Sequence, residues 1–301
     1  MEGEGFNKSP RLSPYEIYLF SKASYQLGIK NIKLTGGEPT ARADLLEIVR
    51  LIRSISDEID LSMTTNGFTM NSLAYKLKEG GLNRINISLH SLREEVFERI
   101  TGVKNGLKRV LEGINASLEA GLRPIKINLV VLKGINDNEV WNIIDFCSKI
   151  GSNLHIIELH PVGLGAREFL KYHDNLNVIE AKLKEMAVKS YFRDKHARPV
   201  YQLPSGIEVE IVKPYANPMF CSSCNRIRLT AEGKIKTCLY REDKSVNVID
   251  ILRSGMKEEE IVSELKRRIL FANYIREPNF KYREGKLISS AKNLFSEIIN
   301  A

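Results

Sequence analysis

Three cysteines near residue 230 have the spacing of ligands to a metal centre. Cys221 and Cys224 are separated by two residues, and thirteen residues separate Cys224 from Cys238. A C-x2-C turn brings two thiolates onto one metal. The alternating segments RIRLT and KIKTCL, joined by residues 231–234, predict a hairpin that returns Cys238 to the same place. The sequence therefore predicts a zinc or iron–sulfur site with three thiolates and no obvious fourth protein ligand.

The remaining cysteine, Cys147, is the first candidate for the fourth ligand. It lies in DFCSKIG, within a predicted helix, where a lone cysteine usually fills an apolar gap. We therefore expect a coordination position left open for substrate, as in catalytic metal sites. Cysteine thiolates are the usual ligands of a [4Fe–4S] cluster. Two alternatives stay open for these cysteines. They could be buried structural residues, or they could form a zinc ribbon that Cys147 completes.

Basic side chains at defined positions predict an anion site beside these cysteines. Arg226 and Arg228 are two residues apart, so on an extended strand they share a face and form a receptor for an anion with several oxygens. Lys126 lies in the apolar strand IKINLVV, where a buried lysine is costly unless it meets a partner or ligand. The net charge of +8 agrees with an anionic partner. Because the cations are dispersed and no aromatic residues alternate with them, nucleic acid is not predicted.

Polar residues also gather where predicted strands end. In TGGEP, Gly36 and Gly37 permit close approach of a ligand to the backbone, and Glu38 can accept a hydrogen bond from an ammonium group. Lys33 lies two positions before Thr35 and faces the same way. Carboxyl ends of parallel strands are where α/β barrels build active sites.

Short β-rich runs alternate with amphipathic runs over the first 165 residues. The candidate strands are 31–36, 60–67, 84–90, 124–131 and 153–161, and the helical patterns are 14–28, 43–54, 71–79, 93–100, 106–120 and 138–150. This order implies parallel strands with right-handed crossovers. The strand ends favour a TIM-like barrel over a doubly wound sheet, and a helix at the start in place of a strand makes that barrel incomplete.

The pattern changes after residue 165, which predicts two parts. Residues 1–165 would form a partial barrel and residues 166–301 a smaller C-terminal module. In the second part we expect a helix at 176–188, a strand at 207–212, the cysteine segment, and helices near 247–253, 257–268 and 286–299. No apolar run is long enough to span a bilayer and no signal peptide opens the chain, so we expect a cytoplasmic protein with no membrane partner.

The chain contains five motifs, which are KLTGGEPTAR, MTTNG, LNRINISLHSL, IKINLVVLKGIND and CSSCNRIRLTAEGKIKTCL. Together they resemble the MoaA family, the radical S-adenosylmethionine (SAM) GTP 3′,8-cyclases of molybdenum cofactor biosynthesis. The resemblance runs in order from about residue 10 to 245. It implies an incomplete (β/α)6 barrel and an auxiliary [4Fe–4S] cluster on Cys221, Cys224 and Cys238, with the free iron coordinated by GTP. The matching GTP positions are Lys33, Thr64, Lys126, Arg226, Ile227 and Arg228. The matching SAM positions are Gly36, Gly37, Glu38, Ser88 and His160.

The resemblance also implies a reaction and a partner. In this family a 5′-deoxyadenosyl radical removes the C3′ hydrogen of GTP, and the carbon radical attacks C8 of guanine to give (8S)-3′,8-cyclo-7,8-dihydroguanosine 5′-triphosphate. The product would pass to the cyclic pyranopterin monophosphate synthase, and a homodimer is compatible with the resemblance. Two alternatives stay open: another radical SAM enzyme with an auxiliary cluster, and a non-catalytic zinc- or nucleotide-binding protein.

Some family features are absent. The second, SAM-cleaving [4Fe–4S] cluster is held in the family by an N-terminal C-x3-C-x2-C loop, but no cysteine precedes Cys147 here. We therefore expect a chain that starts after that loop and lacks radical generation of its own. His160 stands where the family usually has Met, and His90 where an Asp is common. The final residues IINA replace a Gly-Gly tail.

Overall fold

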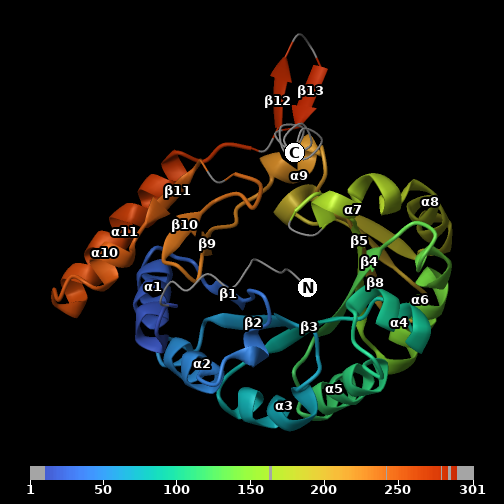
Figure 1. Ribbon diagram of the computed structural model, residues 1–301, viewed down its shortest axis with the longest axis horizontal. Coiled ribbons are helices and arrows are strands. Elements are labelled where there is room, and N and C mark those ends of the chain that lie inside the picture. Colours follow the sequence, from blue (N-terminus) through green and yellow to red (C-terminus); the bar gives the residue numbers. More distant parts are fainter. Residues whose placement is uncertain (1–10, 163–164, 242, 279, 284–285, 290–301) are drawn as a thin grey trace.

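A curved eight-stranded sheet forms the centre of the molecule (Figure 1). The computed structural model describes residues 11–162, 165–241, 243–278, 280–283 and 286–289. The sheet order is β1-β2-β3-β4-β5-β8-β7-β6, so β1 and β6 are its edges. Its strands are β1 (Asn31–Leu34), β2 (Asp60–Thr65), β3 (Arg84–Ser88), β4 (Ile125–Val131), β5 (Asn153–Glu158), β6 (Lys189–Phe192), β7 (Pro199–Gln202) and β8 (Glu208–Val212). Neighbouring strands are parallel from β1 to β5 and on to β8, whereas β7 and β6 are antiparallel.

Helices cover the convex face of this sheet (Figure 1). They are α1 (Pro14–Gln26), α2 (Leu45–Arg53), α3 (Met70–Glu79), α4 (Glu94–Thr101), α5 (Leu107–Glu119), α6 (Val140–Ile150) and α8 (Asn177–Met186). The loops that follow the strands contain α7 (Gly165–Tyr172) and the short 3-10 turns η1 (Pro39–Ala41), η2 (Asp137–Glu139) and η3 (Lys195–Ala197). In α2 the buried residues 45, 48, 49 and 52 form one apolar stripe, as helical periodicity requires. Among the described residues, no helix combines the length and apolarity needed to cross a bilayer.

The main hydrophobic core lies between the sheet and these helices. Strand residues such as Leu61, Met63 and Ile127 contribute to it and have no solvent exposure. Because side chains alternate across a strand, their neighbours point to the concave face, and these neighbours are largely polar. The concave face is thus free for chemistry while the convex face supplies stability.

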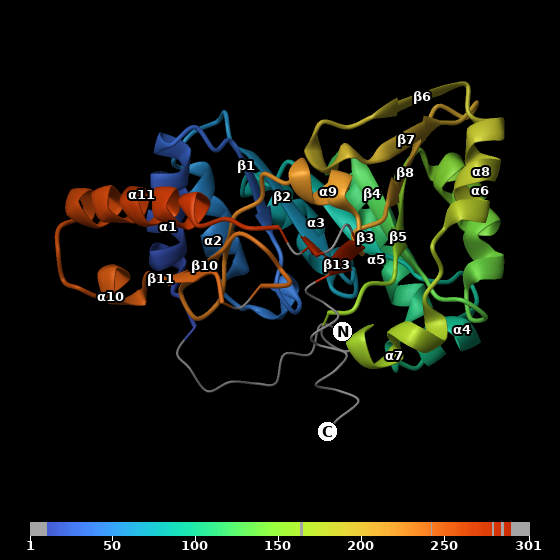
Figure 2. The same cartoon turned by 90° about the horizontal axis from the view of Figure 1, so that it is seen from above.

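A second core joins α1 to the C-terminal part of the chain. That part contains α9 (Pro218–Ser222), β9 (Arg228–Leu229), β10 (Lys234–Lys236), β11 (Ser245–Asn247), α10 (Ile249–Leu252), α11 (Glu258–Tyr274), β12 (Phe280–Arg283) and β13 (Lys286–Ser289). Leu19 of α1 and Leu265 of α11 are buried in it. Glu16 also pairs with Arg253, with Oε1 and Nε 2.7 Å apart. Helix α1 therefore fixes β9–β11 beside the β1 edge of the barrel sheet (Figure 2).

Most of the expected elements are confirmed, and three expectations need correction. The strand expected at 207–212 is β8, which pairs with β5 and so belongs to the barrel sheet and not to a separate module. The helix expected at 286–299 is wrong for 286–289, which form β13, and the remainder lies outside the described residues. The helix expected at 257–268 continues to Tyr274. The division at residue 165 stays a prediction, although the sheet itself continues past it.

Candidate functional site

The concave face of the sheet carries a continuous set of polar side chains. On each strand, the residues that alternate with core residues point to this face. They are Lys33, Thr64, Arg84, Asn86, Ser88, Lys126, Asn128, His155 and Glu210. Several of them contact one another across neighbouring strands. Asn128 Oδ1 lies 3.0 Å from Nδ1 of His155, and Nε2 of His155 lies 3.3 Å from Nζ of Lys126. The interior is therefore a polar network and not the packed apolar centre of an ordinary barrel.

Glu210 on β8 is the anionic centre of this network. Its side chain is only 2% exposed, and its carboxylate lies 2.7 Å from Nε of Arg198, 2.8 Å from Nε of Arg193 and 3.2 Å from Nε2 of His155. Lys126 is more distant, at 3.6 Å. Burial alone would raise the pKa of Glu210, but the surrounding His155, Arg198 and Lys126 outweigh it, and the pKa is lowered. Glu210 is therefore an anion that compensates cations from β4 and the β6–β7 hairpin.

Other cations of the interior are not compensated in this way. Burial, together with Arg84 and Arg226, lowers the pKa of Lys33 to about 7, although its side chain still reaches solvent through the open concave side. Burial and Arg226 likewise lower the pKa of Lys195. Within the described ranges, the side chains of Lys33, Lys195 and Arg226 have neither a hydrogen bond nor an ion pair. Grouped cations without a carboxylate are a receptor for a multiply charged anion.

The three predicted cysteine ligands lie beside these cations. Cys221 is in α9, Cys224 follows it, and Cys238 follows β10; all three are half-buried and none forms a disulfide. The amide of Cys224 donates to the carbonyl of Cys221 at 3.1 Å, which closes the predicted turn. Burial, then Cys238 and Cys221, raise the pKa of Tyr240, so these two thiols lie close to one phenol ring. Cys224 lies near Lys195 and Arg226, because its charge partly opposes the lowering of their pKa values.

Cys221, Cys224 and Cys238 are the residues that would hold a cluster. Across the part of the chain that the structure describes, no three His, Cys, Asp or Glu side chains converge closely enough to hold one metal ion. A [4Fe–4S] cluster needs wider spacing, because each cysteine binds a different iron atom. Cys147 is fully buried in the main core, and burial raises the pKa of its thiol to about 12. It is therefore a packing residue, as expected, and a zinc ribbon completed by Cys147 is not supported.

The glycine loop after β1 is held in place by its own glutamate. The Glu38 carboxylate accepts hydrogen bonds from the amide and hydroxyl of Thr40 at 3.0 and 2.7 Å, from the hydroxyl of Thr65 at 2.6 Å and from the amide of Asn66 at 2.7 Å. These bonds join the end of β1 to the end of β2. Glu38 is thus a positioning residue, and its expected contact with an ammonium group stays a prediction. Gly36 has φ +143°, and a Cβ there would meet no atom within 4 Å, so the backbone of this loop is open to close approach.

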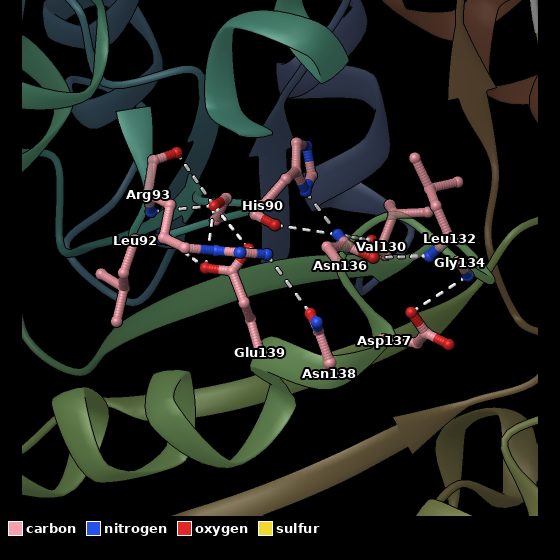
Figure 3. A network of polar contacts seen from close by, with 11 residues as sticks. His90, Leu92, Arg93, Val130, Leu132, Gly134, Asn136, Asp137, Asn138 and Glu139 are labelled. Atoms are coloured by element: carbon pink, nitrogen blue, oxygen red, sulfur yellow. Dashed lines mark hydrogen bonds and ion pairs between the residues drawn. The ribbon is translucent and has the colours of Figure 1, made fainter. Parts of the chain in front are cut away.

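The loops after β3 and β4 are joined by a buried polar network (Figure 3). Nδ2 of Asn136 donates to the carbonyls of His90 and Val130 at 2.8 and 2.9 Å. Glu139 accepts from the hydroxyl of Ser91 and the amide of Leu92. Burial lowers the pKa of His90 to about 4, so the ring is neutral, and its Nδ1 can accept from the amide of Val130 at 3.3 Å. This network fixes the chain that follows the predicted ligand Ser88.

Two predicted site residues have side chains in other surroundings. Ile227 packs against the second core, so any contact with a nucleotide would come from its main chain. His160 lies after β5 with its ring edge toward Tyr240, at 6.0 Å between centroids, and burial lowers its pKa. Lys33, Thr64 and Lys126 share the concave face, whereas Arg226 lies outside any strand because β9 begins at Arg228.

Sequence reasoning missed several residues of this interior, namely Arg84, His155, Arg193, Lys195, Arg198 and Glu210. The rule applied to Lys126, that a charged residue inside an apolar strand faces a ligand or partner, would have found Glu210 in IEVEIV and His155 in NLHIIE. No comparable signal existed for Lys195, because it lies in a turn. Its contribution depends on how the β6–β7 hairpin folds over the sheet.

The fold and the site define the class of protein as an open α/β barrel with a glycine loop at the carboxyl end of its first strand. The family model for the Radical SAM superfamily matches residues 3–147, and the model for Molybdenum Cofactor Synthesis C matches residues 152–282. The chain belongs to the MoaA family of radical SAM enzymes, because curated members match it at about half identity over nearly its whole length.

Three similar relatives carry the name probable GTP 3′,8-cyclase. The protein from Sulfurisphaera tokodaii is 51% identical over 94% of this chain and 89% of its own length. The relatives from Saccharolobus islandicus and Metallosphaera sedula are each 50% identical over 94% of this chain, and the match covers 91% and 88% of their lengths. Among solved structures, the radical SAM enzyme coproporphyrinogen III oxidase (HemN) from Escherichia coli has a TM-score of 0.44 at 13% identity, over 60% of this chain and 48% of that chain.

Proposed function

We propose that this chain binds GTP as the substrate of a 3′,8-cyclase in molybdenum cofactor biosynthesis. The observation that carries the proposal is the group of cations without carboxylate partners among the described residues, Lys33, Lys195 and Arg226, next to a module with three cysteines that form no disulfide. A nucleoside triphosphate carries several negative charges and needs several cations at one place. The family membership and the name shared by the relatives support GTP as the nucleotide.

The chain's own residues would bind and orient the nucleotide. Arg226 and Lys33 would neutralise phosphate oxygens, with Arg228 at the start of β9 beside them. Lys126 would present its ammonium group to the nucleotide, since His155 and Glu210 hold it at 3.3 and 3.6 Å. Thr64 lies on the same concave face and can donate or accept a hydrogen bond. Such positioning is a major source of rate enhancement, because it holds reacting atoms in one geometry.

Cys221, Cys224 and Cys238 would hold the auxiliary cluster. When bound by these three thiolates, a [4Fe–4S] cluster would supply an iron to which GTP could coordinate. The residues of TGGEP, with Ser88 and His160, would hold SAM, and the backbone at Gly36, which is open to close approach, supports this assignment. These ligand sets are our proposal.

This sequence contains no residues that match the ligands of the SAM-cleaving cluster. The 301 residues contain no cysteine before Cys147, and Cys147 is buried in the core. We expect no 5′-deoxyadenosine after reconstitution with iron, sulfide, SAM and a reductant. Formation of this product would contradict that expectation without affecting the GTP site.

Anaerobic metal analysis tests the cluster assignment. We expect about four irons per chain and a broad absorbance near about 400 nm after reconstitution. Cys238→Ser should lose most of this iron, whereas the control Cys147→Ala should retain it, because Cys147 lies in the main core. One colourless zinc per chain, or equal iron in both variants, would refute the assignment.

Calorimetric titration with nucleotides tests the substrate. GTP should bind to the reconstituted protein more tightly than guanosine, because guanosine lacks the phosphates, and more tightly than ATP, which has the same phosphates but another base. Equal affinity for ATP and GTP would reduce the proposal to a general polyphosphate site.

In our proposal the cyclised product is then taken over by the cyclic pyranopterin monophosphate synthase.

A further inference from the structure

The tip of the β6–β7 hairpin lies against the cysteine module. The turn η3 (Lys195–Ala197) joins the two strands, and the amide of His196 donates to the carbonyl of Ser223 at 3.0 Å. The imidazole of His196 stacks on the ring of Phe220, with centroids 4.1 Å apart and planes 11° from parallel. Phe220 and Ser223 flank Cys221 in the sequence. The hairpin tip is therefore fixed to the segment that carries two of the cysteines.

The backbone of this tip is strained. His196 has φ +66° and Ala197 has φ +45°, both in the left-handed region. This region is unfavourable for a residue with a side chain, and such strain persists only where the surroundings enforce it. The bond to Ser223 and the stacking on Phe220 provide that enforcement. The direction of the preceding residue, Lys195, is thus set by contacts with the cysteine module.

His196 also leaves polar atoms without partners. The residue is 1% exposed, and neither ring nitrogen has a hydrogen-bond partner within the residues that the structure covers. Buried polar atoms of this kind are uncommon and cost free energy. Burial, with Arg226, Arg198 and Lys195, lowers the pKa of His196 to about 3, so the ring is neutral. The tip is therefore not optimised for the stability of the chain by itself, which is typical of a ligand site.

Charge pairing at the tip of the hairpin leaves Lys195 without a carboxylate partner among the described residues. Arg193 pairs with Glu208 at 3.1 Å and with Glu210 at 2.8 Å, and Arg198 pairs with Glu210 at 2.7 Å. Lys195 has no such partner among the residues described. It lies near Arg226 and Arg84, which lower its pKa after burial does. The hairpin thus directs one uncompensated ammonium group toward the predicted phosphate-binding arginines.

We propose that Lys195 is a further substrate-binding residue, which contacts the phosphate groups of a nucleoside triphosphate held between Lys33 and Arg226. This inference rests on the proposed function and adds to the site a residue that the family motifs do not contain. Lysine suits the role because its compact ammonium group can contact different phosphate oxygens. The hairpin then closes the site from the side opposite β1, since β6 and β1 are the two edges of the sheet.

Calorimetric titration of the reconstituted full chain with GTP, inorganic tripolyphosphate and guanosine tests this role. Lys195→Ala should weaken binding of GTP and of tripolyphosphate about tenfold, the loss expected for one charge-assisted hydrogen bond. Binding of guanosine should not change. Lys195→Arg should recover most of the affinity, because it retains the charge. The matched control is Lys189→Ala, since Lys189 is an exposed lysine on β6 of the same hairpin, and it should behave as the unmodified protein.

The outcomes separate this inference from the proposed function. Unchanged tripolyphosphate affinity in Lys195→Ala would overturn the role of Lys195, even if GTP remains the preferred nucleotide. Equal losses in Lys195→Ala and Lys189→Ala would also overturn it, because the effect would then be general electrostatics. Conversely, a site that binds tripolyphosphate through Lys195 but does not prefer GTP to ATP would contradict only the proposed function.

Discussion

Removal of the charge of Glu210 should destabilise the protein and at the same time strengthen anion binding. In Glu210→Gln, the shape of the side chain is kept while Arg193 and Arg198 lose their common anion. Breaking a buried ion pair by removing one partner costs about 3 to 5 kcal/mol. We expect the lower end, about 3 kcal/mol, because Arg193 is a third exposed and retains Glu208 at 3.1 Å. With about 2 to 4 °C per kcal/mol, the melting temperature should fall by roughly 6 °C or more.

The assay is thermal unfolding followed by circular dichroism, with Glu208→Gln as the control. The side chain of Glu208 is 29% exposed, so its pair with Arg193 should contribute no more than about 1 kcal/mol. Because the pKa of Glu210 is lowered, its contribution is present above its ordinary pKa of 4.5 and is lost as the pH falls further. The difference between the unmodified protein and Glu210→Gln should therefore shrink below about pH 4.5.

Addition of tripolyphosphate should distinguish a charge network from simple packing. Without Glu210 the interior has more uncompensated positive charge, so the variant should bind tripolyphosphate more tightly than the unmodified protein. A ligand at one hundred times its Kd stabilises the folded state by about 2.7 kcal/mol, enough to recover most of the loss. A variant as stable as Glu208→Gln, or one with weaker anion binding, would refute our reading of Glu210.

Further predictions concern the framework of the site. Glu38→Gln should lower stability by about 1 to 3 kcal/mol, because an amide donor would replace an acceptor facing the donors of the β1 and β2 loops; unchanged denaturant unfolding would contradict this. Gly113→Ala should be strongly destabilising despite a helix-propensity gain of about 1 kcal/mol, because its Cβ would lie 2.2 Å from the carbonyl oxygen of Gly67. An expressed variant with unchanged melting temperature would disprove that close contact. His196→Phe should reduce the acid sensitivity of the protein. The pKa of His196 is lowered to about 3, so the unfolded state binds the proton first and stability falls as the pH drops below 6.5. Melting temperatures measured from pH 7 to pH 4 should fall less in this variant, and parallel curves would count against a buried neutral imidazole.

Periodicity and turn residues identified the repeating part of the fold. The five strands and six helices expected before residue 162 are present within a few residues, because alternation and amphipathic stripes report local burial directly. The same reasoning failed at residues 207–212, where a correct strand was assigned to the wrong part of the chain. Pairing of β8 with β5 joins segments about fifty residues apart, and no local pattern encodes that contact.

The site divides in a similar way. Cys221, Cys224 and Arg226 could be predicted as ligands because metal and anion ligands repeat at short, characteristic spacings, and these roles stay predictions. Glu38 was found as a site residue, but its four hydrogen bonds to neighbouring loops were not foreseen. Which donors reach a carboxylate depends on how two strand ends meet in space.

The sequence by itself determined the alternating α/β elements, the three-cysteine motif, the glycine loop and the family, because each is written in local spacing or in collinear motifs. Only the tertiary structure decided the charge balance of the interior. Glu210 pairs with Arg193 and Arg198, while Lys33, Lys195 and Arg226 come together from separate elements without a carboxylate partner among the described residues, and their pKa values are lowered. The physical reason is that electrostatic energy depends on distances between residues far apart in the chain, and folding alone sets those distances.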